Sequence, residues 1–381
     1  MQGKKKKIRN ISFVVAFVIV SLLVIMFNYF VDPYGYAQDK VKNMQKLDIH
    51  SEPHDMTYTY LNKTKKVKVE HVLIGTSSAT SLLNLDLFHC CTAERMAILA
   101  NPQMSLDETY DILKYFLELH PEVQHVFVSF DVNTYLYDLP YVTLPKKPTN
   151  FIQDFIKLYY SLGVTKASFN KIMEKYKPQA EIAEPSYYVN QKRKYYYEHN
   201  VESCMEENLE KLHKIRELLA SKNIKATYFM TPLHALYLSN MYKTNKLEKL
   251  ENLKREFAQI TPFYDMAIIT KHTSEPFEYF WADVIHPLPF ISYRIYDVLV
   301  YKKDNPEFAI LLDKNNIEQT LKKQRKLIEN YIEKNTDYVN EYVNSNLTNE
   351  EMEAAGYMKK SPPRFCGCGY DNCIVDYMGR F

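Results

Sequence analysis

The stretch VKVEHVLIGTSSA, residues 67–79, is the part of the sequence from which the fold class is inferred. Its first eight residues are rich in β-branched side chains and end at Gly75, which predicts a buried β-strand. A turn of hydroxyl residues follows at once, and residues 78–88 predict a short helix. This order presents Ser77 at the carboxyl edge of a sheet, where the first N–H groups of the helix can face an oxyanion. Ser77 is therefore a candidate nucleophile, although helix capping is the other role open to it.

Strand and helix patterns alternate from residue 67 to residue 301. The further predicted strands are residues 95–100, 125–130, 224–230 and 264–269, and the further predicted helices are residues 105–119, 206–221, 242–259 and 291–301. The first of these helices opens on a capping box at Ser105. The alternation predicts an α/β fold: a three-layer, doubly wound parallel sheet with helices on both faces. Ligands of such sheets bind beyond the carboxyl ends of the strands.

The amino terminus predicts a membrane anchor. Residues 1–10 are a basic segment, and residues 11–31 are an uncharged run long enough to cross the hydrocarbon core as a helix. The basic cluster is expected to stay inside, which places the main domain outside the cytoplasmic membrane. A cleaved signal peptide is the alternative, but the run is longer than a usual signal core and no A-x-A-like cleavage site follows it.

The rest of the chain divides around the predicted sheet. We expect a connector over residues 32–66, one α/β domain over residues 67–305, and a helical segment with a cysteine-bearing tail over residues 306–381. Residues 134–201 are rich in Pro and Tyr and interrupt the alternation, so they are interpreted as an insertion that could form a lid or a substrate wall.

Composition narrows the classes of function. Lys and Arg number 48 and Asp and Glu 46, so the chain has no basic excess of the kind that nucleic-acid binding needs. Three of the six cysteines, Cys366, Cys368 and Cys373, have the spacing of half a zinc site, but no second pair of ligands accompanies them. A disulfide or free thiols are the alternative for this tail.

A second motif lies near the end of the predicted domain. Residues 280–287 read FWADVIHP, with Asp283 and His286 three positions apart. Such a pair fits one loop, in which the imidazole of His286 faces a serine while the carboxylate of Asp283 orients the ring. The other interpretation is that Asp283 caps a helix and that His286 is an unrelated, hydrogen-bonded histidine. The two motifs together, in this order within an α/β alternation, favour a Ser77, His286 and Asp283 triad.

The chain resembles the SGNH (GDSL-like) hydrolases at these residues, over roughly residues 60–305. It is similar in particular to their membrane-anchored branch that serves cell-envelope acylation, which includes the D-alanine transfer protein of lipoteichoic acid assembly and the alginate O-acetylation proteins. The resemblance implies a flavodoxin-like α/β fold, Ser77 as nucleophile, His286 as general base and Asp283 as its orienting partner. It also implies an ester substrate, no metal or organic cofactor, and a multi-spanning membrane acyltransferase as a partner.

The chain departs from the family pattern in two places. Thr76 stands where many members have Asp, and no glycine occurs where the family takes one oxyanion donor. Asn101 and Asn133 are the candidate donors, with turn formation and strand-end capping as their alternatives. Gly75 and Asp131 are secondary candidates, Asp131 as a residue that helps to hold the site. His234, just past a predicted strand end, is interpreted as a surface histidine in preference to a pocket residue.

These observations lead to one functional hypothesis and two alternatives. The hypothesis is a membrane-anchored serine esterase or O-acyltransferase that acts on acyl or acetyl esters of a cell-surface polysaccharide or envelope polymer. The first alternative is an inactive assembly or polymer-binding factor, and the second is a lipase or lysophospholipase. Hydrolysis and transfer share the acyl-serine intermediate, so the sequence does not separate them.

Overall fold

The computed structural model describes most of the predicted α/β region and the N-terminal helix. The described residues are 2–33, 47–48, 57–65, 67–80, 95–100, 104–136, 155–156, 158–174, 205–274, 284–287, 295–302 and 305–344. All six cysteines, Asp283 and Asn101 lie outside these ranges.

A seven-stranded sheet forms the centre of the protein, in the order β1-β3-β2-β4-β5-β6-β7. Its strands are β1 (Leu47–Asp48), β2 (His71–Gly75), β3 (Met96–Ala100), β4 (His125–Phe130), β5 (Lys225–Met230), β6 (Phe263–Asp265) and β7 (Ile310–Leu312). All neighbouring strands pair in parallel except β6 and β7. The predicted α/β class with a parallel sheet is therefore confirmed.

The central strands are buried because both faces of the sheet are covered. Every residue of β3 and β4 is buried, which is why these strands read as continuous apolar runs without alternation. The strands β3, β2, β4, β5 and β6 lie side by side in that order. When these five strands are numbered along the chain from β2, the order becomes 2-1-3-4-5, which is known from doubly wound sheets. In such an order the chain leaves β2 in one direction and returns past it to β4, so a crevice opens at the carboxyl ends of β2 and β4.

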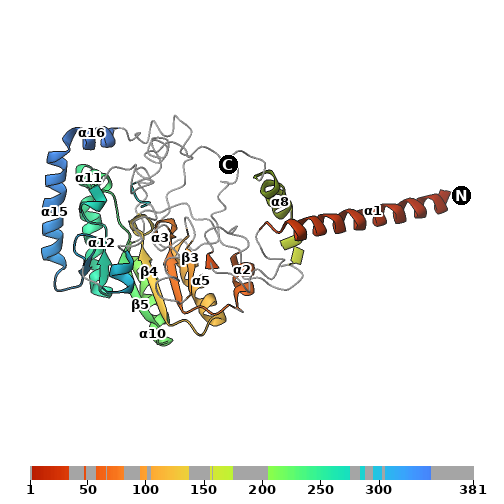
Figure 1. Ribbon diagram of the computed structural model, residues 1–381, viewed down its shortest axis with the longest axis horizontal. Coiled ribbons are helices and arrows are strands. Elements are labelled where there is room, and N and C mark those ends of the chain that lie inside the picture. Colours follow the sequence, from red (N-terminus) through yellow and green to blue (C-terminus); the bar gives the residue numbers. More distant parts are fainter. Residues whose placement is uncertain are drawn as a thin grey trace.

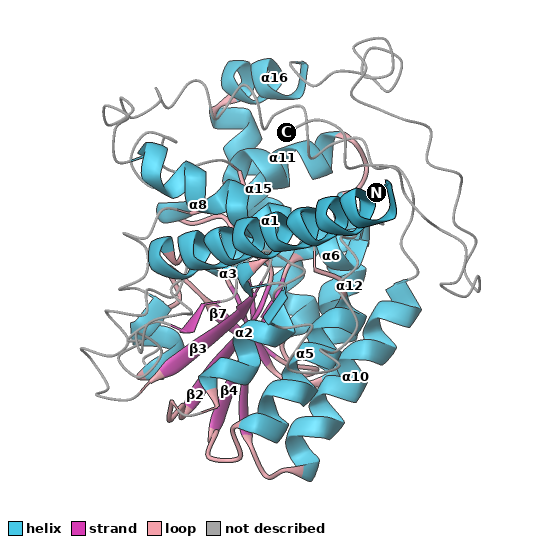
Figure 2. Cartoon of the chain, turned by 90° about the vertical axis from the view of Figure 1, so that its right-hand side faces the viewer, coloured by secondary structure: helices cyan, strands magenta, loops and turns pink. Residues whose placement is uncertain are grey.

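Three amphipathic helices line up along one side of the sheet (Figure 2): α5 (Leu106–Leu119), α10 (Met205–Ser221) and α12 (Leu247–Ile260). The predicted capping box of α5 is confirmed, since the hydroxyl of Ser105 accepts from the Glu108 N–H and the Glu108 carboxylate accepts from the Ser105 N–H. Further helices are α2 (Thr57–Thr64), α3 (Ser77–Thr80) and α6 (Val132–Leu136).

The helix predicted over residues 242–259 is wrong at its start. The chain forms two helices there, α11 (Ala235–Lys243) and α12, separated by Asn245, whose φ of 56° is left-handed. Asn tolerates this conformation better than most residues, so it ends one helix and lets the chain redirect into the next. The helix expected over residues 291–301 is described as a five-residue π-helix, Tyr296–Val300.

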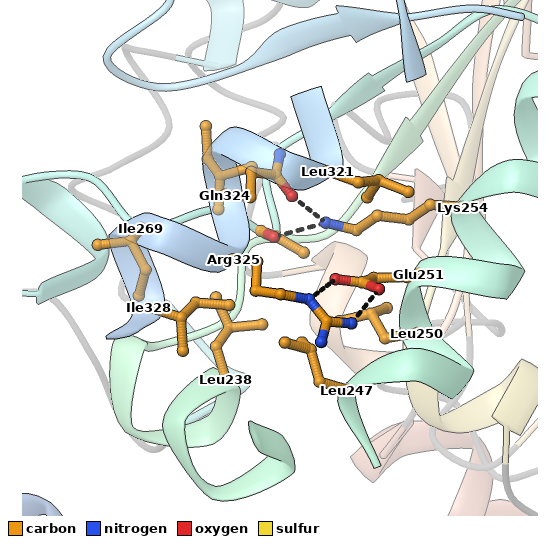
Figure 3. A pocket seen from close by; sticks show the side chains of 12 residues that line it. Leu238, Leu247, Leu250, Glu251, Lys254, Ile269, Leu321, Gln324, Arg325 and Ile328 are labelled. Atoms are coloured by element: carbon orange, nitrogen blue, oxygen red, sulfur yellow. Dashed lines mark hydrogen bonds and ion pairs between the residues drawn. The ribbon is translucent and has the colours of Figure 1, made fainter. Parts of the chain in front are cut away.

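The sheet extends past the domain boundary expected at residue 305, because β7 pairs with β6. The chain then forms α15 (Ile317–Lys334) and α16 (Thr336–Asn344), and α15 packs on the α/β domain through buried polar contacts (Figure 3). Lys254 donates to the carboxylate of Asp265 at 2.7 Å and to the side chain of Gln324 at 3.1 Å. Burial of this ion pair is tolerable because its charges are met by hydrogen bonds.

One N-terminal helix, α1 (Gln2–Val31), is long and apolar enough over Asn10–Val31 to span a membrane. It projects from the rest of the protein with its amino terminus farthest away (Figure 1). The helix α8 (Leu162–Glu174), which falls within the predicted insertion, lies against the carboxyl-terminal part of α1.

A buried polar cluster occupies the amino-terminal edge of the sheet, opposite the edge that carries Ser77. His125, the first residue of β4, lies beside His71 of β2, and its Nε2 is 2.8 Å from Oγ1 of Thr227. Lys302 donates to the same Oγ1 at 2.9 Å. Burial, aided by the positive charges nearby, lowers the pKa of His125 from 6.5 to about 3.

Acid is therefore expected to destabilise the fold through His125. Below the unfolded pKa of 6.5 the unfolded chain binds a proton that the folded chain does not bind until about pH 3, so stability falls as pH drops through this window. His125→Gln retains an acceptor for Thr227 and removes the titration. Urea unfolding gives the unfolding free energy of both chains at about pH 7 and about pH 5. The decrease between the two pH values should be about 2 kcal/mol smaller in the His125→Gln variant than in the unmodified chain. Equal losses in the two chains would contradict this role.

Candidate active site

The site is built where β2 turns into α3. Ser77 is the first residue of α3, two residues beyond the end of β2 at Gly75. Its Oγ lies 2.9 Å from Nε2 of His286, although the two residues are 209 positions apart in the chain. Both side chains are partly exposed, so a substrate can reach the pair. A hydroxyl within hydrogen-bond distance of an imidazole is the arrangement from which a histidine activates a serine nucleophile.

His286 is held by a short segment that docks on the end of β5. Its neighbours Val284, Ile285 and Pro287 are buried, and the carbonyl of Val284 accepts from the backbone N–H of His234 at 2.9 Å. His234 follows β5 by a few residues, so the sheet itself sets the position of the His286 segment. Because the residues on both sides of His286 are buried, the imidazole of His286 is the group of this segment that faces Ser77.

His234 is fully buried, so its interpretation as a surface histidine is wrong. The residue is the N-cap of α11, and its Nδ1 accepts from the Leu236 N–H at 3.1 Å. An accepting Nδ1 requires the neutral ring with its proton on Nε2. Histidine is an uncommon N-cap, which is why sequence patterns did not reveal this role.

Asp131 holds the turn that carries Ser77 from both sides. It follows β4 directly and is buried. Its Oδ2 accepts from the hydroxyl of Thr76 at 2.6 Å and from the hydroxyl of Ser78 at 3.1 Å. The residues before and after Ser77 are thus tied to one carboxylate, which directs the Ser77 side chain away from the core toward His286. Thr76, which departs from the family pattern, supplies the shorter of the two hydrogen bonds.

Gly75 is required by close packing between β2 and β4. A Cβ at this position would lie 2.7 Å from Cβ of Ser129 and 2.9 Å from Cβ of Ala79. Both distances are shorter than any side chain tolerates, so only glycine lets the end of β2 approach β4 this closely. The close approach places Thr76 within reach of Asp131.

A small pocket lies beneath the turn, lined by Thr76, Ser129, Asp131 and Thr134 among other residues. The hydroxyl oxygens of Ser129 and Thr134 are buried and have no hydrogen-bond partner among the described residues.

Several predicted site residues are not placed relative to Ser77. Asp283 and Asn101 lie outside the described residues. Asn133 lies within α6, but its side chain also falls outside the described part of the chain. Within the described ranges, no group of three or more His, Cys, Asp or Glu side chains is arranged to hold a metal ion. The described site is therefore the Ser77 and His286 pair with its support at Gly75 and Asp131.

The comparisons with known proteins do not identify a family. No protein-family model matches the chain, and no curated protein matches it.

Substitution of Gly75 by Ala should disrupt the site through steric conflict with Ser129. Overpacking of this kind costs about 1–3 kcal/mol of unfolding free energy. The double substitution Gly75→Ala and Ser129→Gly removes the nearest obstructing atoms and should recover part of that loss, although Ala79 still crowds the new Cβ. Thermal unfolding of the two single variants and the double variant measures the coupling, and additive losses would show that Ser129 is not the obstacle.

Removal of the Asp131 carboxylate should leave the hydroxyls of Thr76 and Ser78 buried without an acceptor. Asp131→Ala is expected to lower the unfolding free energy by about 2–4 kcal/mol. Asp131→Asn keeps one acceptor oxygen of similar geometry and should lose less than half as much. Urea unfolding of both variants provides the test, and equal losses would mean that the two hydrogen bonds do not stabilise the turn.

Proposed function

We propose that this chain is a membrane-anchored serine esterase or O-acyltransferase of the SGNH type that acts outside the cytoplasmic membrane. The observation that carries the proposal is the 2.9 Å contact between Ser77 Oγ and His286 Nε2 at the carboxyl edge of a parallel sheet. The strand order supports it, because the pair lies at the crevice where doubly wound sheets bind their ligands.

The pair can carry out acyl transfer in two steps. His286 Nε2 accepts the proton of the Ser77 hydroxyl as Oγ attacks the ester carbonyl, which forms a tetrahedral oxyanion. The same imidazole then returns the proton to the departing alcohol as the ester C–O bond breaks, which leaves an acyl-serine. In the second step water or a sugar hydroxyl gives its proton to His286 and attacks the acyl-serine, and Ser77 is released with its proton restored.

Two further contributions belong to the proposal. Asp283 would orient the His286 ring and stabilise its protonated form. Asn101, Asn133 and the N–H of Ser77 would donate to the oxyanion, and loss of one such donor costs about a hundredfold to a thousandfold in rate. A structure in which both Asn101 and Asn133 point away from Ser77 would favour the alternative, a non-enzymatic assembly factor.

The location and substrate are inferred from the amino terminus. Basic residues precede the apolar part of α1, and such segments remain on the cytoplasmic side. The α/β domain at the other end of α1 would then face the cell envelope (Figure 1). Its substrates would be acyl or acetyl esters of a surface polysaccharide or related polymer, with a multi-spanning membrane acyltransferase as the source of acyl groups for a transferase.

Hydrolysis of p-nitrophenyl acetate by the full chain in detergent tests the chemistry. Ser77→Ala and His286→Gln should each lower kcat about a thousandfold or more, because the nucleophile and its base act as a unit. Ser221→Ala, at the exposed end of α10, is the matched control and should leave the rate unchanged. Transfer of acetyl to added glycerol, compared with release of acetate, separates a transferase from an esterase.

Two outcomes would contradict the proposal. One is turnover by the Ser77→Ala variant at the rate of the unmodified chain, which would exclude the acyl-serine. The other is a folded chain without turnover on this ester or on acetylated polysaccharide, which would favour the polymer-binding assembly factor.

A further inference from the structure

A second helical segment binds along the membrane anchor. Residues 158–160 and α8 pack on the last third of α1 and satisfy its buried polar side chain, Asn28, which is 1% exposed. The amide nitrogen of Asn28 donates to the carbonyl of Tyr159 and to the hydroxyl of Thr165, each at 2.9 Å. Its amide oxygen accepts from the hydroxyl of Ser168 at 2.9 Å. An amide in the apolar part of an anchor would be costly without such partners.

The contact continues along α1 in both directions from Asn28. The hydroxyls of Ser21 and Tyr160 lie 2.7 Å apart, and Lys171 donates to the carbonyl of Asp32 at 2.6 Å. Ser21 and Asp32 mark the two ends of the contact, which spans about 16 Å of the α1 axis at about 1.5 Å per residue. The segment therefore lies at the same depth as the second half of the apolar run.

The length of α1 places this contact inside the bilayer. The span Asn10–Val31 has 22 residues and a length of about 33 Å, close to the hydrocarbon thickness of about 30 Å. Residues 10–20, which precede the contact, measure only about 16 Å. If the docked segment stayed in water, α1 would be too short to cross, so a spanning α1 takes residues 155–156 and 158–173 into the leaflet beside the domain.

The surface of the segment suits that environment. Leu162, Phe169 and Met173 are 90%, 58% and 57% exposed, and their spacing of seven and four residues places them on one stripe of α8. Phe155 and Ile156 are exposed nearby. Large apolar side chains exposed together mark an interaction surface, in contrast to scattered single ones.

This apolar stripe continues the lipid-facing surface of α1. The rings of Phe27 and Phe169 are 4.9 Å apart, so the exposed side of α8 adjoins the exposed side of the anchor. Lys166 is exposed and lies on the same stripe, four residues after Leu162 and three before Phe169. A lysine can extend its ammonium to the headgroups while its stem stays in hydrocarbon.

We propose that residues 155–156 and 158–173 form a second membrane-embedded element, which binds the acyl chains of the leaflet nearest the α/β domain. The predicted insertion then holds the domain to the membrane beside α1, so the protein contacts lipid through two packed helices. The inference rests on the anchor in the proposed function and is independent of the Ser77 chemistry.

Quenching of tryptophan fluorescence by brominated acyl chains tests this proposal on the full chain in phosphatidylcholine vesicles. The only tryptophan, Trp281, is first replaced in a Trp281→Phe background. Leu162→Trp and Phe169→Trp each report on α8. Phe17→Trp is the positive control on the anchor, and Leu311→Trp on the exposed edge strand β7 is the control in water.

We expect brominated lipid to lower the emission of the Leu162→Trp and Phe169→Trp variants at least twofold, as in the Phe17→Trp variant, with no change for Leu311→Trp. Emission from both α8 variants that matches the Leu311→Trp variant, while the Phe17→Trp variant is quenched, would overturn the second element and leave the anchor intact. Loss of quenching in the Phe17→Trp variant as well would overturn the anchor and the inference that depends on it.

Discussion

The turn after β2 depends on one buried carboxylate. Asp131 accepts hydrogen bonds from the residues on both sides of Ser77, and it can do so because Gly75 lets β2 approach β4 without a side chain between them. Parallel pairing of these two strands therefore sets the direction of the Ser77 hydroxyl. A side chain fixed by strand packing and two hydrogen bonds is held more precisely than one on a free loop, and in the proposed reaction this would lower the entropic cost of bringing Ser77 to an ester carbonyl.

His286 is positioned by a contact with a different strand. The segment that carries His286 is held at the end of β5 by the hydrogen bond between His234 and Val284. Ser77 and His286 are therefore both positioned by the carboxyl edge of the same sheet. One strand, β4, lies between β2, which carries Ser77, and β5, on which the His286 segment docks. The polar contacts of Lys254 at the far side of the domain hold the C-terminal helix α15 and do not take part in this geometry.

Sequence patterns predicted the α/β class, the central strands and the proximity of Ser77 and His286, because buried parallel strands and a glycine-hydroxyl turn have strong local sequence signals. They did not predict β7, a three-residue edge strand, or the helix break at Asn245. The capping role of His234 depends on tertiary burial and leaves no pattern. Periodicity also could not reveal that α8 faces the anchor, because an apolar stripe suits lipid and a protein core equally. The positions of Asp283 and Asn101 stay predictions.

The proposed chemistry requires Ser77 to be a nucleophile that His286 activates. Reaction of the full chain with a fluorophosphonate probe, followed by peptide mapping with mass spectrometry, tests this role. We expect a single adduct on Ser77 that is absent from Ser77→Ala and forms far more slowly in His286→Gln. A folded chain that the probe does not label, or one labelled at another serine with equal efficiency in all three forms, would contradict it.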